Sequence, residues 1–168
     1  QLFVVPVPAL DDEPFYAPAP AVSEGEDLPP RRVIAAEPVA LTEGSASHNL
    51  VAFTADGTEV LTDVDEIERD TPDLRSQIVA VRVDGSGERT VVSRDAGLSV
   101  MDVAVSAGGT IALLAAAMGP DGTDFVAAPV SVWTVTDEGV DRLTDPDTVT
   151  GDDAHLSFSG ADILVQHQ

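Results

Sequence analysis

Hydrophobic residues in the middle of the chain fall into short runs separated by polar turns. Between residues 50 and 93 the runs are Leu50–Phe53, Glu59–Val64, Gln77–Asp84 and Arg89–Ser93. Their shortness and their content of Val favour strands over helices. Ala-Asp-Gly-Thr at 55–58 and Asp-Gly-Ser-Gly at 84–87 are typical of hairpin turns. The pattern predicts a four-stranded antiparallel unit, with a polar excursion at 65–76 between its second and third strands.

The next stretch of the chain repeats this plan. Its runs are Val100–Val105, Ile111–Ala116, Val130–Thr136 and Val140–Leu143. An excursion at 117–129 again lies between the second and third runs, and Asp-Glu-Gly at 137–139 separates the last two. A helical repeat is disfavoured because uninterrupted stretches with a period of 3.6 residues are missing.

Two short phrases return at a nearly constant spacing. Ala-Phe-Thr-Ala-Asp-Gly-Thr at 52–58 returns as Ala-Val-Ser-Ala-Gly-Gly-Thr at 104–110, and a shorter form is Ser-Phe-Ser-Gly-Ala-Asp at 157–162. A second phrase reads Leu-Thr-Glu at 41–43, Val-Ser-Arg at 92–94 and Leu-Thr-Asp at 143–145. A repeat of about 50 residues indicates a solenoid or a propeller. Four strands per repeat are the blade of a β-propeller, so we predict an all-β propeller of four-stranded antiparallel blades.

The two ends of the chain carry parts of the same unit. Strands three and four are matched by Leu2–Val7 and Pro38–Thr42, and strands one and two by Leu156–Phe158 and Ile163–Gln166. The chain is therefore divided at 1–43, 44–93, 94–145 and 146–168, as the end of a blade, two whole blades and the start of another. Residues 8–37 hold six prolines among many acids and are expected to form a surface insertion. Because a propeller usually closes with at least four blades, we expect this chain to be a fragment or a nicked piece of a propeller that the rest of the molecule completes.

The chain is strongly acidic, with a net charge of −22 and no lysine. Such a surface repels nucleic acid and anionic membranes, which are bound through clustered positive charge. Cysteine is absent, which excludes disulfides and thiolate metal sites and leaves the compartment open, with the cytoplasm favoured. No run approaches 18 apolar residues, so the sequence predicts no membrane-spanning helix. Only 4% of the residues are aromatic, so Val, Ala, Leu and Ile must fill the core.

The sequence contains no complete catalytic or metal-binding motif. The nearest approach to the Gly-x-Ser-x-Gly elbow of an α/β-hydrolase surrounds Ser99, which lacks the closing glycine and leads into a strand. His48 and His155 each fall just before the first strand of a unit, where a role in a turn or at the entry to a blade is expected. Trp133 lies within a strand and is expected to pack in the core or between blades. We assign no catalytic residue, no metal and no cofactor to the chain.

Five acidic residues are clustered at the start of the first polar excursion, at positions 63, 65, 66, 68 and 70. Its carboxylates lack the sharp-turn glycine and the spaced glutamate of a calcium-binding EF-hand, so a solvated loop is expected. The weaker alternative is that a side chain of this loop points into a substrate chamber, and its candidates are Glu66, Glu68 and Arg69. The turn at 121–124 has a still weaker claim to calcium.

The repeat phrases resemble those of a known group of propellers. Ala-Phe-Thr-Ala-Asp-Gly-Thr-Glu-Val-Leu at 52–61, followed by Gln-Ile-Val-Ala-Val-Arg-Val at 77–83, is similar to the "SPDG" blades of TolB-like proteins and of the prolyl-oligopeptidase family of serine peptidases. The loop at 69–76 and the stretches at 102–114 and 132–135 are similar to blades of the acylaminoacyl-peptidase and dipeptidyl-aminopeptidase members. The resemblance covers most of 38–168, although Thr-Ala at 54–55 and Ser-Ala at 106–107 replace the expected Ser-Pro.

The resemblance to the peptidases implies a two-domain enzyme. An α/β-hydrolase domain would carry the Ser, Asp and His, and the propeller would restrict access to short peptides. The partners would then be the remainder of the polypeptide and the peptide substrates, and a homo-oligomer is compatible with this arrangement. A non-enzymatic TolB-like scaffold for protein partners is the alternative. A third option is a propeller enzyme with carboxylates or a metal in its central channel.

Overall fold

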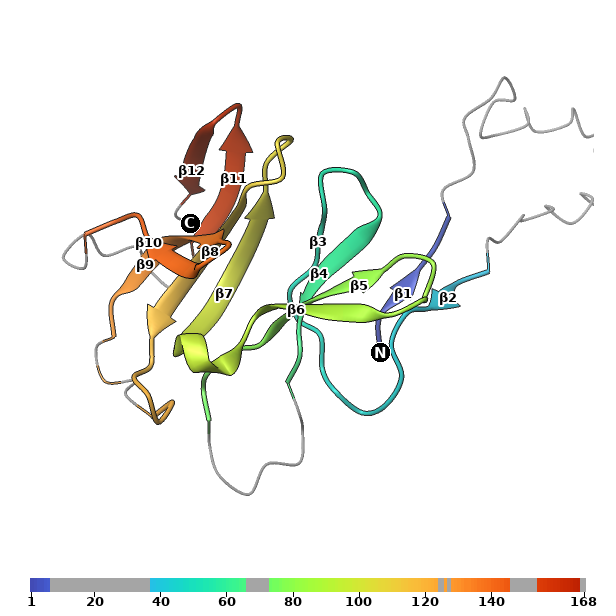
Figure 1. Ribbon diagram of the computed structural model, residues 1–168, viewed down its shortest axis with the longest axis horizontal. Helices are drawn as coiled ribbons and strands as arrows, with labels where there is room; N and C mark the ends of the chain where they lie inside the picture. The colour runs from blue at the N-terminus through green and yellow to red at the C-terminus, as the bar shows by residue number, and fades with distance from the viewer. Residues whose placement is uncertain (7–36, 66–72, 124–125, 127, 146–153, 167–168) are drawn as a thin grey trace, which may run out of the picture.

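The fold consists of short strands that follow one another in chain order (Figure 1). The computed structural model describes residues 1–6, 37–65, 73–123, 126, 128–145 and 154–166. Its strands are β1 (Phe3–Val4), β2 (Val39–Ala40), β3 (Ala52–Phe53), β4 (Glu59–Asp63), β5 (Ile78–Arg82), β6 (Glu88–Val92), β7 (Leu98–Val105), β8 (Ile111–Ala117), β9 (Val130–Thr136), β10 (Gly139–Arg142), β11 (His155–Ser159) and β12 (Asp162–Gln166). A 3-10 turn, η1 (Arg94–Ala96), lies between β6 and β7. In these ranges no helix has the length and apolar character needed to cross a membrane.

The strands form two four-stranded sheets and two smaller pairs, all antiparallel. The first sheet has the order β3-β4-β5-β6, and the second sheet has the order β10-β9-β8-β7, so each is a meander. β1 pairs with β2, and β11 pairs with β12. The prediction of an all-β fold with four-stranded antiparallel sheets is confirmed. The sheets that the structure describes do not close into a ring. Residues 8–36 of the expected insertion lie outside the described ranges.

Strand β8 is buried on both of its faces. Successive residues of a strand point to opposite sides of the sheet. Leu113 belongs to a core cluster with Leu61 and Ile78 of the first sheet, whereas Leu114 belongs to a second cluster with Leu156 of β11. Leu113 and Leu114 are both fully buried. The run at 111–117 is continuously apolar rather than alternating because both faces of β8 are covered.

The second sheet therefore lies between the first sheet and the β11–β12 hairpin. β3 packs against β7, and β11 packs against β7 and β8, so the first strands of successive units lie next to one another. On the other face of the first sheet, Leu41 and Thr42 line a pocket together with Val81 of β5. The β1–β2 pair lies beyond the first sheet, at the opposite end of the molecule from the second sheet and the hairpin (Figure 1).

The Leu-Thr residues that follow β2 and β10 each make the same pair of hydrogen bonds to the neighbouring strand. We call this pair of bonds the clasp. In the β1–β2 pair, the Leu41 N–H donates to the Leu2 carbonyl at 2.8 Å, and the Leu2 N–H donates to Thr42 Oγ1 at 2.8 Å. In the second sheet, the Leu143 N–H donates to the Val132 carbonyl at 2.8 Å, and the Val132 N–H donates to Thr144 Oγ1 at 3.0 Å. The Leu-Thr phrase recurs because it makes this clasp, and β1–β2 corresponds to β9–β10.

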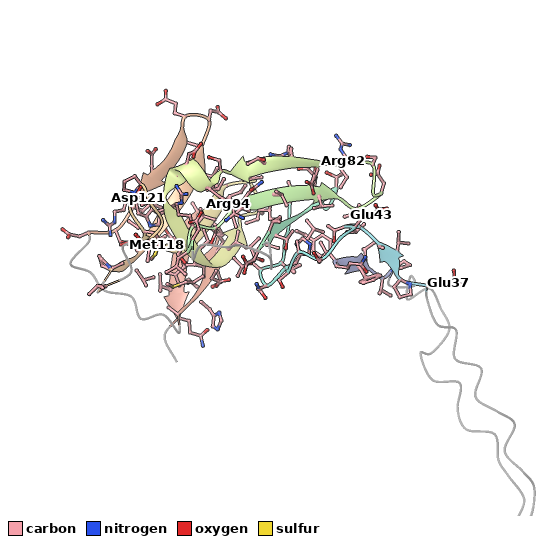
Figure 2. All side chains as sticks on the ribbon, turned by 90° about the horizontal axis from the view of Figure 1, so that it is seen from below. Glu37, Glu43, Arg82, Arg94, Met118 and Asp121 are labelled. Atoms are coloured by element: carbon pink, nitrogen blue, oxygen red, sulfur yellow. The ribbon has the colours of Figure 1, made fainter. Side chains whose placement is uncertain are left out.

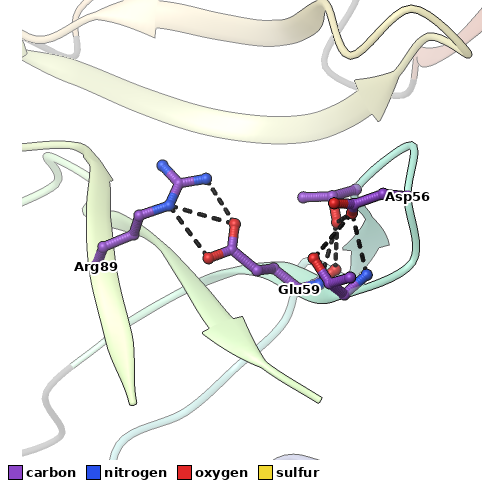
Figure 3. A network of polar contacts seen from close by, with 5 residues as sticks. Asp56, Glu59 and Arg89 are labelled. Atoms are coloured by element: carbon purple, nitrogen blue, oxygen red, sulfur yellow. Dashed lines mark hydrogen bonds and ion pairs between the residues drawn. The ribbon is translucent and has the colours of Figure 1, made fainter. Parts of the chain in front are cut away.

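The first β-hairpin of the first sheet depends on the side chain of Asp56 (Figure 3). Its Oδ1 accepts hydrogen bonds from Thr54 Oγ1 at 2.7 Å, from Thr58 Oγ1 at 2.9 Å and from the Thr58 N–H at 3.1 Å. Gly57 follows in the left-handed region with φ of 68°, which glycine adopts without strain. The second unit has Gly108 in place of Asp56. Its turn is closed by the Ser106 hydroxyl, which accepts from the Thr110 N–H at 2.9 Å.

The hydrogen bonds from Thr54 and then Thr58 lower the pKa of Asp56 below its ordinary value. A carboxylate with a lowered native pKa stabilises the fold above its unfolded-state pKa, which is about 3.9. That contribution is lost as the pH falls through the lowered native value. In an NMR titration of the carboxyl carbon, we expect the Asp56 midpoint to lie below that of an unfolded peptide. A midpoint at or above the peptide value would contradict the turn geometry.

Strand β3 is shorter than the predicted run at 50–53. The N–H groups of Asn49 and Leu50 donate to Asp63 Oδ1 at 2.6 and 2.7 Å, and Asn49 Nδ2 donates to Oδ2 at 3.1 Å. A side chain thus takes the bonds that a strand partner would otherwise accept, so the ladder begins only at Ala52. The sequence pattern marked the apolar run but could not identify this capping carboxylate.

Candidate functional site

A pocket of about 190 Å³ lies where the first sheet meets the second. It is formed by the end of β4, by the segment that leads into β5 and by the start of β7. Its lining residues are Asp63, Val64, Asp65, Asp73, Leu74, Arg75, Ser76 and Ser99. Three carboxylates against one guanidinium give the lining a net negative charge, which favours cationic over anionic ligands.

Hydrogen bonds join the segment before β5 to the second sheet and to the turn that follows β8. The Ser76 N–H donates to the Leu98 carbonyl at 2.7 Å, and the Val100 N–H donates to Ser76 Oγ at 2.8 Å. The Leu74 N–H donates to the Gly122 carbonyl at 3.1 Å. One wall of the pocket therefore bridges two sheets.

Arg75 and Asp73 form the charged centre of this wall. The Asp73 carboxylate accepts three hydrogen bonds from Arg75, from its backbone N–H and Nε at 3.0 Å and from Nη2 at 3.1 Å. Arg75 Nη1 donates a further bond to the Pro120 carbonyl at 2.7 Å. The hydrogen bond to Asp73 is the main cause of a raised pKa for Arg75. A Cβ at Gly122 would collide with both side chains, so the absence of a side chain there lets the 119–122 turn approach the pair.

Arg94 of η1 also binds backbone carbonyls of two segments that line the pocket. Its Nη1 donates to the Arg75 carbonyl at 3.0 Å, and its Nη2 donates to the Val64 carbonyl at 3.2 Å. Figure 2 shows Arg94 on the side of the molecule where Met118 and Asp121 lie, far from Glu37 and Glu43. The Met118 N–H donates to the Gly97 carbonyl at 2.7 Å, which joins η1 to the end of β8.

The side chain of Asp102 joins the second sheet to the β11–β12 hairpin. Asp102 of β7 accepts the Leu156 N–H at Oδ2 at 2.7 Å and the Val103 N–H at Oδ1 at 2.9 Å. His155 Nδ1 lies 3.5 Å from Asp102 Oδ2, with its side chain largely exposed. A carboxylate inside an apolar strand thus holds the backbone of the next unit.

Trp133 is confirmed as a packing residue. It packs against the core cluster between the first and second sheets, and its Nε1 donates to the Ala115 carbonyl at 3.1 Å. The guanidinium of Arg142 lies 5.2 Å from the ring centroid and donates from Nη2 to Ser131 Oγ at 2.6 Å. The indole is therefore held on several sides within the fold.

The candidate residues Glu66, Glu68 and Arg69 lie outside the described residues. Of the other sequence candidates, Ser99 lies within β7 and lines the pocket. His48 precedes β3, at the entry to the first sheet, and donates from Nδ1 to the Asp63 carbonyl at 2.9 Å. Over the described ranges, no group of three His, Cys, Asp or Glu side chains is placed to hold a metal ion.

Sequence reasoning missed the residues that join one sheet to the next, namely Arg75, Ser76, Arg94 and Asp102. Asp102 carried a usable signal, because a carboxylate in an apolar strand must find a partner. Arg75 carried another, since it is one of only eight basic residues in a chain with 30 acidic ones. Ser76 gave no such signal. The arrangement can order loops across sheet boundaries, and its hydrogen-bonding groups are largely committed to doing so.

No protein-family model matches this chain, and none of the curated proteins gives a significant match.

Proposed function

We propose that the sheets are consecutive blades of a β-propeller and that this propeller gates the access of short peptides to a separate serine-hydrolase domain. The observation that carries the proposal is the chain-order stacking of four-stranded meanders, with β3 next to β7 and β7 next to β11. Adjacent first strands are expected where blades surround a common axis.

The repeated clasp adds support for equivalent blades. Leu-Thr at 41–42 and at 143–144 makes the same two bonds to the neighbouring third strand. Such repetition of local chemistry is expected when one structural unit has been copied. It also gives the recurring phrase a structural rather than a catalytic role.

The assignment to a peptidase rests on the resemblance of the phrases at 52–61, 77–83 and 102–114 to prolyl-oligopeptidase blades. The acidic pocket between the sheets is compatible with a dipeptidyl type, because the free amino terminus of such a peptide is positively charged. In this proposal the Ser-Asp-His triad belongs to the hydrolase domain. The chain forms part of the propeller that restricts which peptides reach that domain.

The proposal is tested by fluorophosphonate labelling of the natural polypeptide that carries this sequence, together with any chain that copurifies with it. We expect one serine to be labelled, and we expect preincubation with acylaminoacyl or dipeptidyl substrates to reduce the labelling. Heat-denatured protein is the control, because activation of the serine requires the folded triad. Absence of both labelling and peptide hydrolysis would refute the peptidase role and leave a scaffold of the TolB-like kind.

A further inference from the structure

The three Asp-Gly pairs of the chain, at 56–57, 84–85 and 121–122, occupy the same positions in three turns. In each turn the glycine N–H donates to the carbonyl three residues earlier: Gly57 to Thr54 at 2.9 Å, Gly85 to Arg82 at 2.9 Å and Gly122 to Gly119 at 3.3 Å. The three glycines have φ values of 68°, 72° and 70°. The aspartate is therefore the third residue, and the glycine the fourth, of one kind of β-turn.

An aspartate that precedes a glycine can convert spontaneously to isoaspartate. The glycine nitrogen attacks Cγ of the aspartate, and the hydroxyl of the protonated carboxyl leaves with the amide proton as water, which closes a succinimide ring. Water then adds to one of the two ring carbonyls. Cleavage of the original backbone C–N bond gives isoaspartate, whereas cleavage of the new C–N bond restores aspartate. Glycine favours the attack because it has no Cβ and adopts more backbone conformations than other residues.

The carboxylates of the three turns differ in their hydrogen bonds. Asp56 Oδ1 accepts from Thr54 Oγ1, from Thr58 Oγ1 and from the Thr58 N–H. Asp84 Oδ1 accepts from the Ser86 N–H at 2.9 Å. The Asp121 carboxylate accepts no hydrogen bond from any residue that the structure describes, and Asp121 is exposed. The same backbone turn thus carries a fully held, a partly held and a free carboxylate.

These hydrogen bonds oppose the reaction in two ways. They fix the side chain, so Cγ cannot rotate toward the glycine nitrogen until they break. They also favour the ionised form, which does not lose water readily. The bond from Thr54 is the main cause of the lowered pKa of Asp56, and the bond from Ser86 is the main cause of the lowered pKa of Asp84.

We propose that Asp121 is the site at which the folded protein forms isoaspartate, and that hydrogen bonding protects Asp56. The bond that holds the Gly122 N–H is the longest of the three turn bonds, so this nitrogen is the least engaged. The bonds that reach this turn from the segment before β5 go to the carbonyls of Pro120 and Gly122 and leave both reacting atoms untouched. The inference does not depend on the proposed function.

The modification would disconnect the turn at 119–122 from the wall of the pocket. A Cβ at Gly122 would collide with the side chains of Asp73 and Arg75, so the turn has no spare room against that pair. Isoaspartate lengthens the backbone by one methylene group and therefore displaces the turn. We expect loss of the bond from the Leu74 N–H to the Gly122 carbonyl and of the bond from Arg75 to the Pro120 carbonyl. Hydrogen exchange of the Leu74 amide should accelerate in the modified molecules.

Site-resolved mass spectrometry of the natural polypeptide that carries this sequence tests the proposal. The folded protein is aged at mildly acidic pH, and electron-transfer fragmentation distinguishes isoaspartate from aspartate at each site. Each rate is divided by the rate at the same site in urea. Asp-Gly-Thr is the local sequence at both 56–58 and 121–123, so the ratios compare the effect of the fold alone. We expect the ratio for Asp121 to exceed that for Asp56 by about tenfold or more, because bonds to an ionised group must break at Asp56. A ratio for Asp121 no higher than that for Asp56 would overturn the proposal.

Two variants test the cause and the consequence. Thr58→Val removes the Oγ1 bond to Asp56 and keeps the bond from the Thr58 N–H. It should raise the ratio for Asp56 and leave that for Asp121 unchanged, and an unchanged Asp56 would contradict protection by hydrogen bonding. Asp121→Glu should abolish the modification at this site, because the attack would have to close a larger ring. Ageing should then no longer accelerate exchange of the Leu74 amide, and acceleration in this variant would contradict the displaced turn.

Discussion

Replacing Leu113 with alanine is expected to lower the free energy of unfolding by about 2–5 kcal/mol. Leu113 is fully buried in the cluster that joins the first and second sheets. Its removal leaves a cavity between two sheets, and the flanking strands can close around it only in part. Because small domains are stabilised by only about 5–15 kcal/mol, this loss is large enough to detect in urea.

The matched control is Leu143→Ala, because Leu143 is 53% exposed and contributes its backbone N–H rather than its side chain to the clasp. Its effect should stay within about 0.5 kcal/mol, as is usual for surface substitutions. Equilibrium unfolding followed by circular dichroism measures both variants. Equal destabilisation by the two changes would contradict the burial of β8 between two layers.

Replacing Asp102 with alanine is expected to release the β11–β12 hairpin from the second sheet. The change removes the acceptor of the Leu156 and Val103 N–H groups. Leaving a buried donor without a partner costs about 1–3 kcal/mol. Hydrogen exchange of the Leu156 amide should accelerate by about the corresponding factor of 5 to 150, with smaller changes in the first sheet.

Two further variants separate this bond from an effect of charge. Asp141→Ala in β10 removes the same charge from the second sheet and should leave exchange in the hairpin nearly unchanged. Asp102→Asn retains a side-chain oxygen that can accept the Leu156 N–H and should preserve much of the protection. If all three variants accelerated exchange equally, the Asp102 carboxylate would not be what holds the hairpin on the second sheet.

Strand patterning and turn residues were enough to predict the four-stranded antiparallel sheets. Asp56-Gly57 marks a tight hairpin whose conformation is set by neighbouring atoms, so local sequence carries the information. The continuous run of β8 likewise indicated a strand, although only its packing shows that both faces are covered.

The contacts between sheets could not be predicted in the same way. Ser76 bonds to Leu98 and Val100, which belong to the next sheet, and nothing in its own surroundings in the sequence indicates this. Asp63 caps the segment before β3 from a position 14 residues further along the chain than Asn49. Such bonds depend on how whole sheets pack against one another. The packing of sheets leaves no pattern in the few residues on either side of Ser76 or Asp63.

The second sheet lies between the first sheet and the β11–β12 hairpin, and this order of layers underlies the whole fold. A methyl nuclear Overhauser spectrum tests it, because Leu113 and Leu114 are neighbours on β8 that point to opposite faces. We expect the Leu113 methyls to contact the side of the core that holds Leu61 and Ile78, and the Leu114 methyls to contact the side formed by Leu156. Contacts from both leucines to one and the same layer would contradict it.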